Sequence, residues 1–594
     1  MGAPRRTIAT MIDPVKVLTQ RLADAMTAAA PDAGGIDPVV RPSDRADFQA
    51  NGIMGLAKRM GINPRELAQQ VLDAAELDGV ATAEIAGPGF LNLTLDEAFL
   101  GHSVAEAIGD EAQGIVASQE PQRVVIDYSA PNVAKEMHVG HLRSTVIGDS
   151  LVRILESRGD TVIRQNHIGD WGTPFGMLIE HLIDLGEEGA IAELALGELN
   201  TFYRQARVSF DGSSEFADRS RARVVALQAG DPETLRLWRI LVDLSAEYFQ
   251  AVYDRLGVRL TIDDLVGEST YNELLATVVA DLDAAGMLQT SNGARCVFPD
   301  GFSNREGEPL PLIVQKGEGG YGYAATDLAA IRDRIDRLRA DRLLYVVGSP
   351  QAEHLAMIFA VARDAGWLTD ATEVDHVAFG SVLGEDNKMM KSRAGASLKL
   401  ADLLDEAVAR AAAIVAQKNP DLDEAERAEV ARAVGIGAVK YGDLSSDRTR
   451  DYVFSFDRML AFDGNTSPYL QYVVARVRSI LRKSRVEGIA VPGERDEPVP
   501  DRIGMVEPTE RALGLALLSF GRVVEDSAAS SQPHRLCTYL FELAQTFTRF
   551  YEAAPILKAD TDEQRHHRLA LAVGTERVMV RGLDLLGIEA PQRM

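Results

Sequence analysis

Short apolar runs alternate with longer segments of helical periodicity through the middle of the chain. Strand candidates occur at 123–128, 161–166, 343–347 and 376–382. Between them, apolar residues recur every three or four positions, as in amphipathic helices. Strands that alternate with helices predict a mostly parallel sheet with helices on both faces. We therefore expect a Rossmann-like, nucleotide-binding α/β domain over residues 116–400, with a more helical and less regular insertion at about 180–310.

The first part of the chain, residues 1–115, has a different pattern. Residues 63–66, Asn-Pro-Arg-Glu, fit the N-cap, first and third positions of a helix. Apolar runs at 80–85 and 90–95 flank the sequence Gly-Pro-Gly at 87–89, which is typical of a hairpin turn. We expect residues 1–115 to form a small N-terminal α/β domain.

Strand signals nearly vanish after residue 400. Amphipathic helices dominate instead, and one of them places Leu536, Leu540, Leu543 and Phe547 on a single face. Residues 401–594 are therefore expected to form an all-α helical domain.

The composition is that of an acidic globular protein. Of 594 residues, 62 are Lys or Arg and 88 are Asp or Glu, so the net charge is −26. Such a protein repels phosphate at long range, which excludes indiscriminate nucleic-acid binding but leaves room for a local basic surface. The two cysteines, Cys296 and Cys537, lie far apart and form no cluster with zinc spacing, so we expect no zinc and no other resident metal. No apolar run has the roughly 20 residues of a membrane span and the first residues lack the apolar core of a signal peptide, so we expect a cytoplasmic location.

A first motif occupies residues 129–145, Ser-Ala-Pro-Asn-Val-Ala-Lys-Glu-Met-His-Val-Gly-His-Leu-Arg-Ser-Thr, between a strand candidate and a helix. Free N–H groups in the first turn of such a helix attract phosphate. His138 and His141 are three residues apart and can face one anion, and Gly140 has no side chain to keep a flat base away. These residues predict an ATP site with two imidazoles near the phosphates. Taken alone, the pattern also fits two ordinary histidines at a helix start.

A second motif, Lys-Met-Met-Lys-Ser-Arg at 388–393, follows a strand candidate and a turn at 384–387. Ammonium groups on such a loop can neutralise the charge that builds on a departing pyrophosphate. A lone Lys-x-x-Lys is more often a solvated basic loop, but its presence beside the first motif in one α/β domain favours a function. We expect Lys388, Lys391 and Ser392 to bind the triphosphate.

Together the two motifs resemble the signature sequences of class I aminoacyl-tRNA synthetases, and residues 129–144 resemble the arginyl-tRNA synthetase family in particular. One departure is Met390, where many class I enzymes have serine; it leaves open which of Lys388 and Lys391 contacts the triphosphate. Further resemblances to the family cover nearly the whole chain: Tyr323-Ala-Ala-Thr-Asp327, Val346-Val-Gly-Ser-Pro-Gln351 with His354, Gly464-Asn-Thr-Ser-Pro-Tyr469, Arg549-Phe-Tyr-Glu-Ala-Ala-Pro555 and the terminal residues 586–594.

The resemblance implies an arginine–tRNA ligase. Such an enzyme uses ATP, accompanied by Mg²⁺, to form arginyl-adenylate, then transfers arginine to the 3′ end of tRNA(Arg) and releases AMP and pyrophosphate. Members of the family need tRNA even for the first step. His138, His141 and Lys388 or Lys391 would stabilise charge on the phosphates, and Lys135 would add positive charge beside the degenerate second motif. The rest of the implied ATP site is Pro131, Asn132, Val139 and Gly140.

Arginine's guanidinium is always charged and offers five donors in a rigid fork. A selective pocket must bury carboxylates against it, and this penalises lysine or citrulline because buried acceptors would remain unpaired. Taken alone, Asp327 would be a helix-surface carboxylate. The resemblance instead implies that it binds the guanidinium, with Tyr323 one helical turn earlier. It also implies that Asp127 and Asn132 hold the amino and carboxyl ends of the substrate and that Gln351 makes a further contact.

Basic and aromatic side chains interleave at the start of the C-terminal region. The pattern fits a helical core with arginines outside as well as it fits a tRNA surface. The resemblance to an anticodon-binding helical domain favours the tRNA surface, with Tyr469 and Arg476 as contacts. In the N-terminal domain, Asn92 corresponds to the family element that touches the tRNA elbow. We expect a monomer with no membrane partner. The interleaved residues are Tyr469, Tyr472, Arg476, Arg478, Arg482, Lys483 and Arg485.

Two other functions fit part of the pattern. Small-molecule nucleotidyltransferases also use His-x-Gly-His, but they are typically short, and this chain has a large helical appendage. A catalytically silent tRNA-binding relative would have no need of the two histidines, the lysines and the pocket residues. An arginine–tRNA ligase explains more of the sequence than either alternative.

Overall fold

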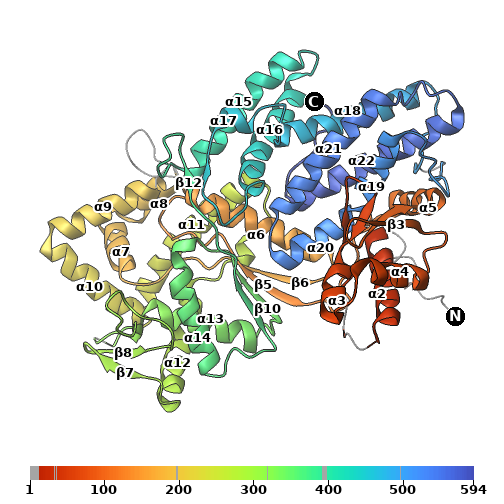
Figure 1. Cartoon of the computed structure of the whole chain (residues 1–594). Helices are drawn as coiled ribbons and strands as arrows, with labels where there is room; N and C mark the ends of the chain where they lie inside the picture. The colour runs from red at the N-terminus through yellow and green to blue at the C-terminus, as the bar shows by residue number, and fades with distance from the viewer. Residues whose placement is uncertain are drawn as a thin grey trace, which may run out of the picture.

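The computed structural model describes residues 13–31, 34, 37–195, 199–317, 319–390, 398–494 and 497–594. Figure 1 shows the small N-terminal domain beside the helical C-terminal region, with the central sheet in the middle and a helical insertion at the far end. The N-terminal domain touches the helical region mainly through α5 (Glu97–Gly109), which packs against α19 (Pro508–Leu518) and α22 (Asp562–Leu585).

The N-terminal domain is built on a four-stranded antiparallel sheet of order β1-β2-β4-β3. Asn63 caps a helix as predicted, since its side chain accepts the backbone N–H of Arg65 at 2.9 Å. The predicted hairpin is confirmed: β3 and β4 pair across residues 87–89. The elements are α2 (Pro14–Ala29), β1 (Val40–Pro42), β2 (Phe48–Ala50), α3 (Gly52–Met60), α4 (Pro64–Ala74), β3 (Ala81–Ala86), β4 (Phe90–Leu95) and α5.

The central sheet has the order β11-β10-β5-β6, and every neighbouring pair of strands is parallel. This confirms the predicted α/β fold. The strand expected at 376–382 is wrong in its bounds, because β11 spans Glu373–His376. The chain stays beside the end of β10 as far as Phe379, which forms a parallel bridge with Gly348, and it turns away at Gly380, whose N–H donates to the carbonyl of Arg448 at 2.9 Å. The elements are β5 (Arg123–Asp127), α6 (Val139–Ser157), β6 (Thr161–Gln165), α13 (Tyr323–Asp336), β10 (Arg342–Tyr345), η4 (Ser349–Gln351), α14 (Ala352–Asp364), β11 (Glu373–His376) and β12 (Val382–Leu383).

An insertion separates β6 from β10, as the sequence predicts. It begins with five helices and continues into a small antiparallel sheet of order β7-β8-β9. Its elements before α13 are α7 (Pro174–Leu185), α8 (Glu187–Ala195), α9 (Leu199–Gly212), α10 (Ser214–Gln228), α11 (Pro232–Leu256), η2 (Ile262–Asp264), η3 (Glu268–Tyr271), α12 (Asn272–Ala284), β7 (Gln289–Ser291), β8 (Ala294–Val297) and β9 (Leu312–Gln315).

The C-terminal region is helical, as predicted, apart from β13 (Tyr452–Val453), which pairs in parallel with β12. The helix α6 packs against α15, α16, α20 and α22, so the central domain and the helical region share one continuous core. Among the described residues, no helix combines the length and the apolar character needed to cross a membrane. The helices are α15 (Leu400–Lys418), α16 (Glu424–Leu444), α17 (Phe456–Met459), α18 (Ser467–Val486), α19, α20 (Phe520–Ser530), α21 (His534–Ala553) and α22.

Candidate active site

The loop between β5 and α6 carries the first motif and lies at the carboxyl edge of the sheet. Ser129, Ala130 and Ala134 have positive φ angles of 75°, 48° and 57°. Backbone of this kind costs about 1–3 kcal/mol per residue and persists only where surrounding contacts hold it in place. Each of the three N–H groups donates to a side chain from another part of the domain: Ser144 Oγ at 2.8 Å, Asn166 Oδ1 at 2.9 Å and Ser245 Oγ at 3.0 Å, in that order.

His138 and His141 form a reciprocal cap at the start of α6. The Nδ1 of His138 accepts the N–H of Gly140 at 3.0 Å, and the Nδ1 of His141 accepts the N–H of His138 at 3.1 Å. A ring nitrogen that accepts has its lone pair free, so each neutral ring carries its proton on Nε2. The ring centroids are 4.0 Å apart. The helix start therefore presents two adjacent Nε2–H donors.

Both imidazoles are held in the neutral form. Burial, with a further contribution from His138, lowers the pKa of His141 to about 3. Burial and then the charge of Lys135 lower the pKa of His138. Lys135 lies beside the histidines with its Nζ 4.5 Å from the ring centroid of Tyr203 on α9. The first motif thus combines two neutral donors with one ammonium group.

The chain that leaves the second motif is bonded to the first. Residues 398–400 run antiparallel to residues 137–139, with an isolated bridge between His138 and Lys399. The N···O distances of this pairing are 3.1 Å from Val139 to Leu398 and 2.9 Å from Leu400 to Met137.

Lys388 is exposed at the end of a tight turn in which the N–H of Gly384 donates to its carbonyl at 2.8 Å. Met389 pairs back to Leu383 at the end of β12. The chain that follows the second motif is therefore paired, through residues 398–400, with the first motif, which lies about 250 residues earlier in the sequence. Lys391 and Ser392 lie outside the described residues.

Acidic side chains gather beside the first turn of α13. The Oδ2 of Asp327 lies 2.6 Å from the Nε2 of His354, and this hydrogen bond raises the pKa of His354. Glu268, which the sequence analysis did not single out, is partly buried, and burial followed by the charges of Asp170 and Asp327 raises its pKa to about 7. Tyr323, one turn before Asp327, is 74% exposed. A carboxylate whose pKa is raised in this way is stabilised when a cation binds beside it. A guanidinium can pair with both Glu268 and Asp327.

Asp127 ends β5 and is buried in an ion pair that the sequence did not predict. Its Oδ2 accepts from the guanidinium of Arg334 at 2.7 Å. Arg334 is itself 1% exposed and also donates from Nε to Gln165 at 2.6 Å. One oxygen of Asp127 is thus engaged within the protein.

The remaining predicted contacts surround the same strand ends. Pro131 is buried, and its carbonyl accepts the N–H of Gly169 at 3.2 Å. A side chain at 169 would collide with the amide of Asn132, which is exposed, so a glycine there leaves room for it. Gln351 is exposed at the end of η4, directly before α14, whose first turn holds His354.

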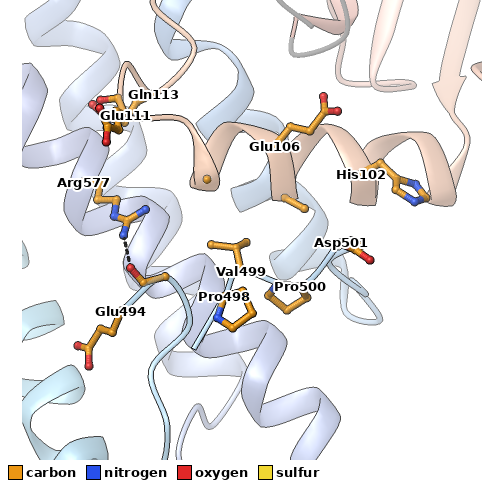
Figure 2. A pocket seen from close by; sticks show the side chains of 13 residues that line it. His102, Glu106, Glu111, Gln113, Glu494, Pro498, Val499, Pro500, Asp501 and Arg577 are labelled. Atoms are coloured by element: carbon orange, nitrogen blue, oxygen red, sulfur yellow. Dashed lines mark hydrogen bonds between the residues drawn. The ribbon is translucent and has the colours of Figure 1, made fainter. Parts of the chain in front are cut away.

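A cavity of about 920 Å³ lies between α5 and a segment made of residues 493, 494 and 498–501 (Figure 2). Arg577 borders it and donates to the carbonyl of Gly493 at 2.8 Å. Among the described residues of the two motifs, none lines this cavity.

Three family models match the chain. The model "tRNA synthetases class I (R), catalytic domain" matches residues 103–456, "DALR anticodon binding domain" matches 470–594, and "Arginyl tRNA synthetase N terminal domain" matches 16–95. The arginine–tRNA ligase of Thermobifida fusca is 55% identical over 586 residues, which cover 98% of this chain and 100% of that protein. The chain belongs to the class I arginyl-tRNA synthetases.

Other members of the family agree with this result. The arginine–tRNA ligase of Klebsiella pneumoniae strain 342 is 48% identical over 97% of this chain and 99% of its own length. The solved arginyl-tRNA synthetase of Plasmodium falciparum superposes with a TM-score of 0.83 at 28% identity, covering 98% of this chain and 99% of that one. The Thermus thermophilus enzyme gives a TM-score of 0.79 at 26% identity, covering 98% and 100%. The chain is therefore an arginine–tRNA ligase, and ATP is one of its substrates.

In this synthetase, the helical region matched by the anticodon-binding model has a basic pocket. The guanidinium of Arg476 lies over the rings of Tyr472 and Tyr551, at 4.8 and 5.5 Å from their centroids. Tyr469 is partly buried, and its hydroxyl lies 3.3 Å from that of Thr548. A cavity of about 450 Å³ lies beside Tyr472 and Arg476. Its charged lining residues are Lys418, Arg476, Arg482 and Arg593 on the basic side and Asp421 on the acidic side, and the C-terminal residue Met594 also lines it.

Asn92 lies on β4 of the N-terminal sheet, and its Oδ1 accepts from the side chain of Gln49 at 2.7 Å. Asn92 therefore lies in the N-terminal domain, whereas the two motifs lie in the central domain and at its exit. Within the described residues, no group of three or more His, Cys, Asp or Glu side chains could hold a metal ion.

Proposed function

We propose that arginine and ATP react in the crevice at the carboxyl ends of β5 and β10. The observation that carries this assignment is that two neutral imidazole donors stand at the start of α6, after β5, while the paired acids Glu268 and Asp327 stand near the helices that flank β10. Phosphate and guanidinium need these two opposite environments.

In the first step, the carboxylate of arginine attacks the α-phosphate in line. The bond from that phosphorus to the bridging oxygen breaks, and pyrophosphate leaves. His138 and His141 donate from Nε2 to the phosphate oxygens, Lys135 adds a positive charge beside them, and Lys388 or Lys391 neutralises the leaving group together with Ser392. Pro131, Asn132, Val139 and Gly140 hold the nucleotide. Mg²⁺ travels with the ATP phosphates and needs few protein ligands.

For the amino acid, we assign the guanidinium to Asp327 and Glu268, with Tyr323 covering it. Asp127 keeps Oδ1 for the substrate's amino group because Oδ2 is bonded to Arg334. Asn132 and Gln351 contact the other polar groups of the substrate. Lysine would leave at least one carboxylate oxygen unpaired, and this accounts for selection of arginine.

In the second step, a hydroxyl of the terminal ribose of tRNA attacks the carbonyl carbon of arginyl-adenylate, and AMP leaves. We assign tRNA contacts to Asn92 in residues 1–115 and to Tyr469 and Arg476 in residues 401–594, with the chemistry in residues 116–400. Cations close to Tyr rings suit phosphate contacts beside stacked bases. We further propose that one chain acts as a monomer in the cytoplasm; both cysteines are free and buried, which suits a reducing compartment.

The deciding experiment replaces Asp327 by alanine. Arginine-dependent exchange of pyrophosphate into ATP should be abolished, while circular dichroism and the unfolding midpoint stay close to those of the parent. Asp336→Ala, at an exposed position on the same helix, is the matched control and should exchange normally. Near-normal exchange by Asp327→Ala would overturn the arginine pocket. The exchange should also require tRNA, and brisk exchange without it would contradict the family mechanism.

A further inference from the structure

The buried carboxylate of Glu136 joins three parts of the chain. It lies inside the first motif and is 4% exposed. Its Oε1 accepts from the ammonium of Lys399 at 2.9 Å, and its Oε2 accepts from the side-chain amide of Asn200 at 2.6 Å. The Oδ1 of Asn200 in turn accepts the N–H of Glu136 at 3.2 Å. We call Glu136, Asn200 and Lys399 the Glu136 cluster.

Each member of the Glu136 cluster belongs to a different element. Asn200 lies on α9, in the helical insertion. Lys399 directly follows Leu398 and precedes α15, so it lies where the chain emerges from the second motif. Glu136 lies two residues before the histidine that caps α6. A buried carboxylate with charged or polar donors on both oxygens has one well-defined orientation, and removal of one donor is costly.

Lys399 stands against the local preference of its helix. It is the N-cap of α15, with φ −63° and ψ 135°, and its side chain makes no capping bond. Ser, Thr, Asp and Asn are the favoured residues there, and a cation near a helix N-terminus is unfavourable because the helix dipole already places positive charge at that end. A residue that breaks a local rule in this way calls for a compensating contact. The ion pair to Glu136 provides it.

The Glu136 cluster lies beside a backbone pairing between Lys399 and His138. Lys399 is bridged to His138, and the N···O bonds on either side of this bridge are 3.1 and 2.9 Å. Glu136 therefore holds, through its side chain, the same two strands that the backbone pairs beside His138. The reacting groups of an enzyme tolerate little displacement, since about 1 Å can cost a factor of about a hundred in rate.

We propose that Glu136 is a positioning residue for ATP: through Lys399 it fixes the chain leaving the second motif against the histidine cap, and through Asn200 it fixes the insertion to the same point. The proposal rests on the proposed roles of the two motifs. It concerns nucleotide geometry and leaves the arginine pocket untouched.

The test measures the exchange of pyrophosphate with saturating tRNA for Glu136→Ala, Lys399→Ala and the double variant. Each single change should lower kcat/KM for ATP by about tenfold to a hundredfold, with the KM for arginine within about twofold of the parent. The double variant should be no worse than the poorer single variant, because both changes remove one interaction. Lys399→Arg, which can keep the ion pair, should restore most of the loss.

Three further variants make the outcome specific. Arg410→Ala removes exposed ion pairs on the same helix α15 and should leave ATP kinetics unchanged. Asn200→Ala should show part of the loss. If Glu136→Ala does not fold, Glu136→Gln replaces it, because glutamine keeps the volume and an oxygen for Lys399 but presents an N–H group to Asn200.

Any of three results would overturn the proposal. The first is unchanged ATP kinetics in both single variants, and the second is additive losses in the double variant. The third is equal losses for ATP and arginine together with a fall in the unfolding midpoint. His141→Asn in parallel separates it from the proposed function. If His141→Asn is inactive while Glu136→Ala is normal, only the positioning role fails. If both are normal, the assignment of the first motif fails as well.

Discussion

Arg143 and Asp443 form a salt bridge with 3.2 Å between Nε and a carboxylate oxygen, and their side chains are 1% and 0% exposed. Arg143 lies on α6, two residues after His141, whereas Asp443 lies on α16 of the helical region. Arg143 also donates to the carbonyl of Arg450 at 2.9 Å. The helix that begins at the proposed ATP site is therefore bonded directly to the region that is proposed to hold tRNA.

Replacement of Arg143 by methionine should destabilise the protein by about 3–5 kcal/mol, because Asp443 would remain buried without its cation. Burial already raises the pKa of Asp443, and the charge of Arg143 opposes that rise. The loss should therefore be smaller at low pH, where Asp443 is protonated, than at pH 8. Urea unfolding at two pH values measures it. The double variant Arg143→Met, Asp443→Leu should recover most of the stability; a double variant as unstable as the single one would contradict this account.

Gly140→Ala should lower kcat/KM for ATP by about tenfold to a hundredfold. A Cβ at this position would lie 2.8 Å from Cε1 of His138, so the ring must move. The movement takes Nε2 away from the place proposed for the ATP phosphates. Exchange kinetics measure the loss, and the unfolding midpoint should stay within a few degrees of the parent. Gly55→Ala is the control, because a Cβ at Gly55 in α3 meets nothing within 4 Å. Equal ATP kinetics for the two variants would show that the ring position is unimportant.

Arginine should bind more weakly as the pH falls below 7. In the free enzyme the pKa of Glu268 is about 7, and the carboxylate must lose its proton to pair with a guanidinium. At pH 6 about a tenth of it is ionised, so the KM for arginine should be roughly tenfold higher than at pH 8. Glu268→Gln should raise the KM for arginine at pH 8. It should also make this KM less dependent on pH, because the carboxyl group that titrates near pH 7 is gone.

Glu268→Gln should weaken arginine binding but stabilise the fold. Since the fold raises the pKa of Glu268, its charge destabilises the protein above pH 7 and has no such effect below the ordinary pKa of glutamate. Glu268→Gln should therefore raise the unfolding midpoint at pH 8 by about one to a few degrees, and leave it unchanged at pH 4. A lower midpoint at pH 8 would indicate that Glu268 supports the fold instead of the substrate.

Arg476→Ala should raise the KM for tRNA about tenfold and reduce by about one the slope of log affinity against log salt. The reason is that a phosphate contact releases a counterion when it forms. The KM values for ATP and arginine at saturating tRNA should not change. Arg363→Ala, an exposed arginine on α14, is the control and should leave tRNA binding as it was. Filter binding of tRNA at several salt concentrations shows whether Arg476 contacts a tRNA phosphate.

Local features of this protein could be predicted from its sequence because neighbours in the chain produce them. The cap at Asn63, the hairpin at 87–89 and the strand-to-helix loop that carries His138 and His141 all depend on residues a few positions apart. The helical spacing of Tyr323 and Asp327 is of the same kind. The apolar pattern also determined the order of strands and helices, and hence the parallel sheet at whose edge the first motif lies.

Only the tertiary structure decided which distant groups face one another. It paired Asp127 with Arg334, placed Glu268 near Asp327 and paired Lys399 with Glu136. The periodicity of the sequence predicts none of these contacts. It also ended β11 at His376 and turned the chain away from β10 at Gly380, whose N–H donates to the carbonyl of Arg448. The physical reason is common to all of these: a charge or a strand end buried between remote segments is stabilised by partners that the chain brings close only when it folds.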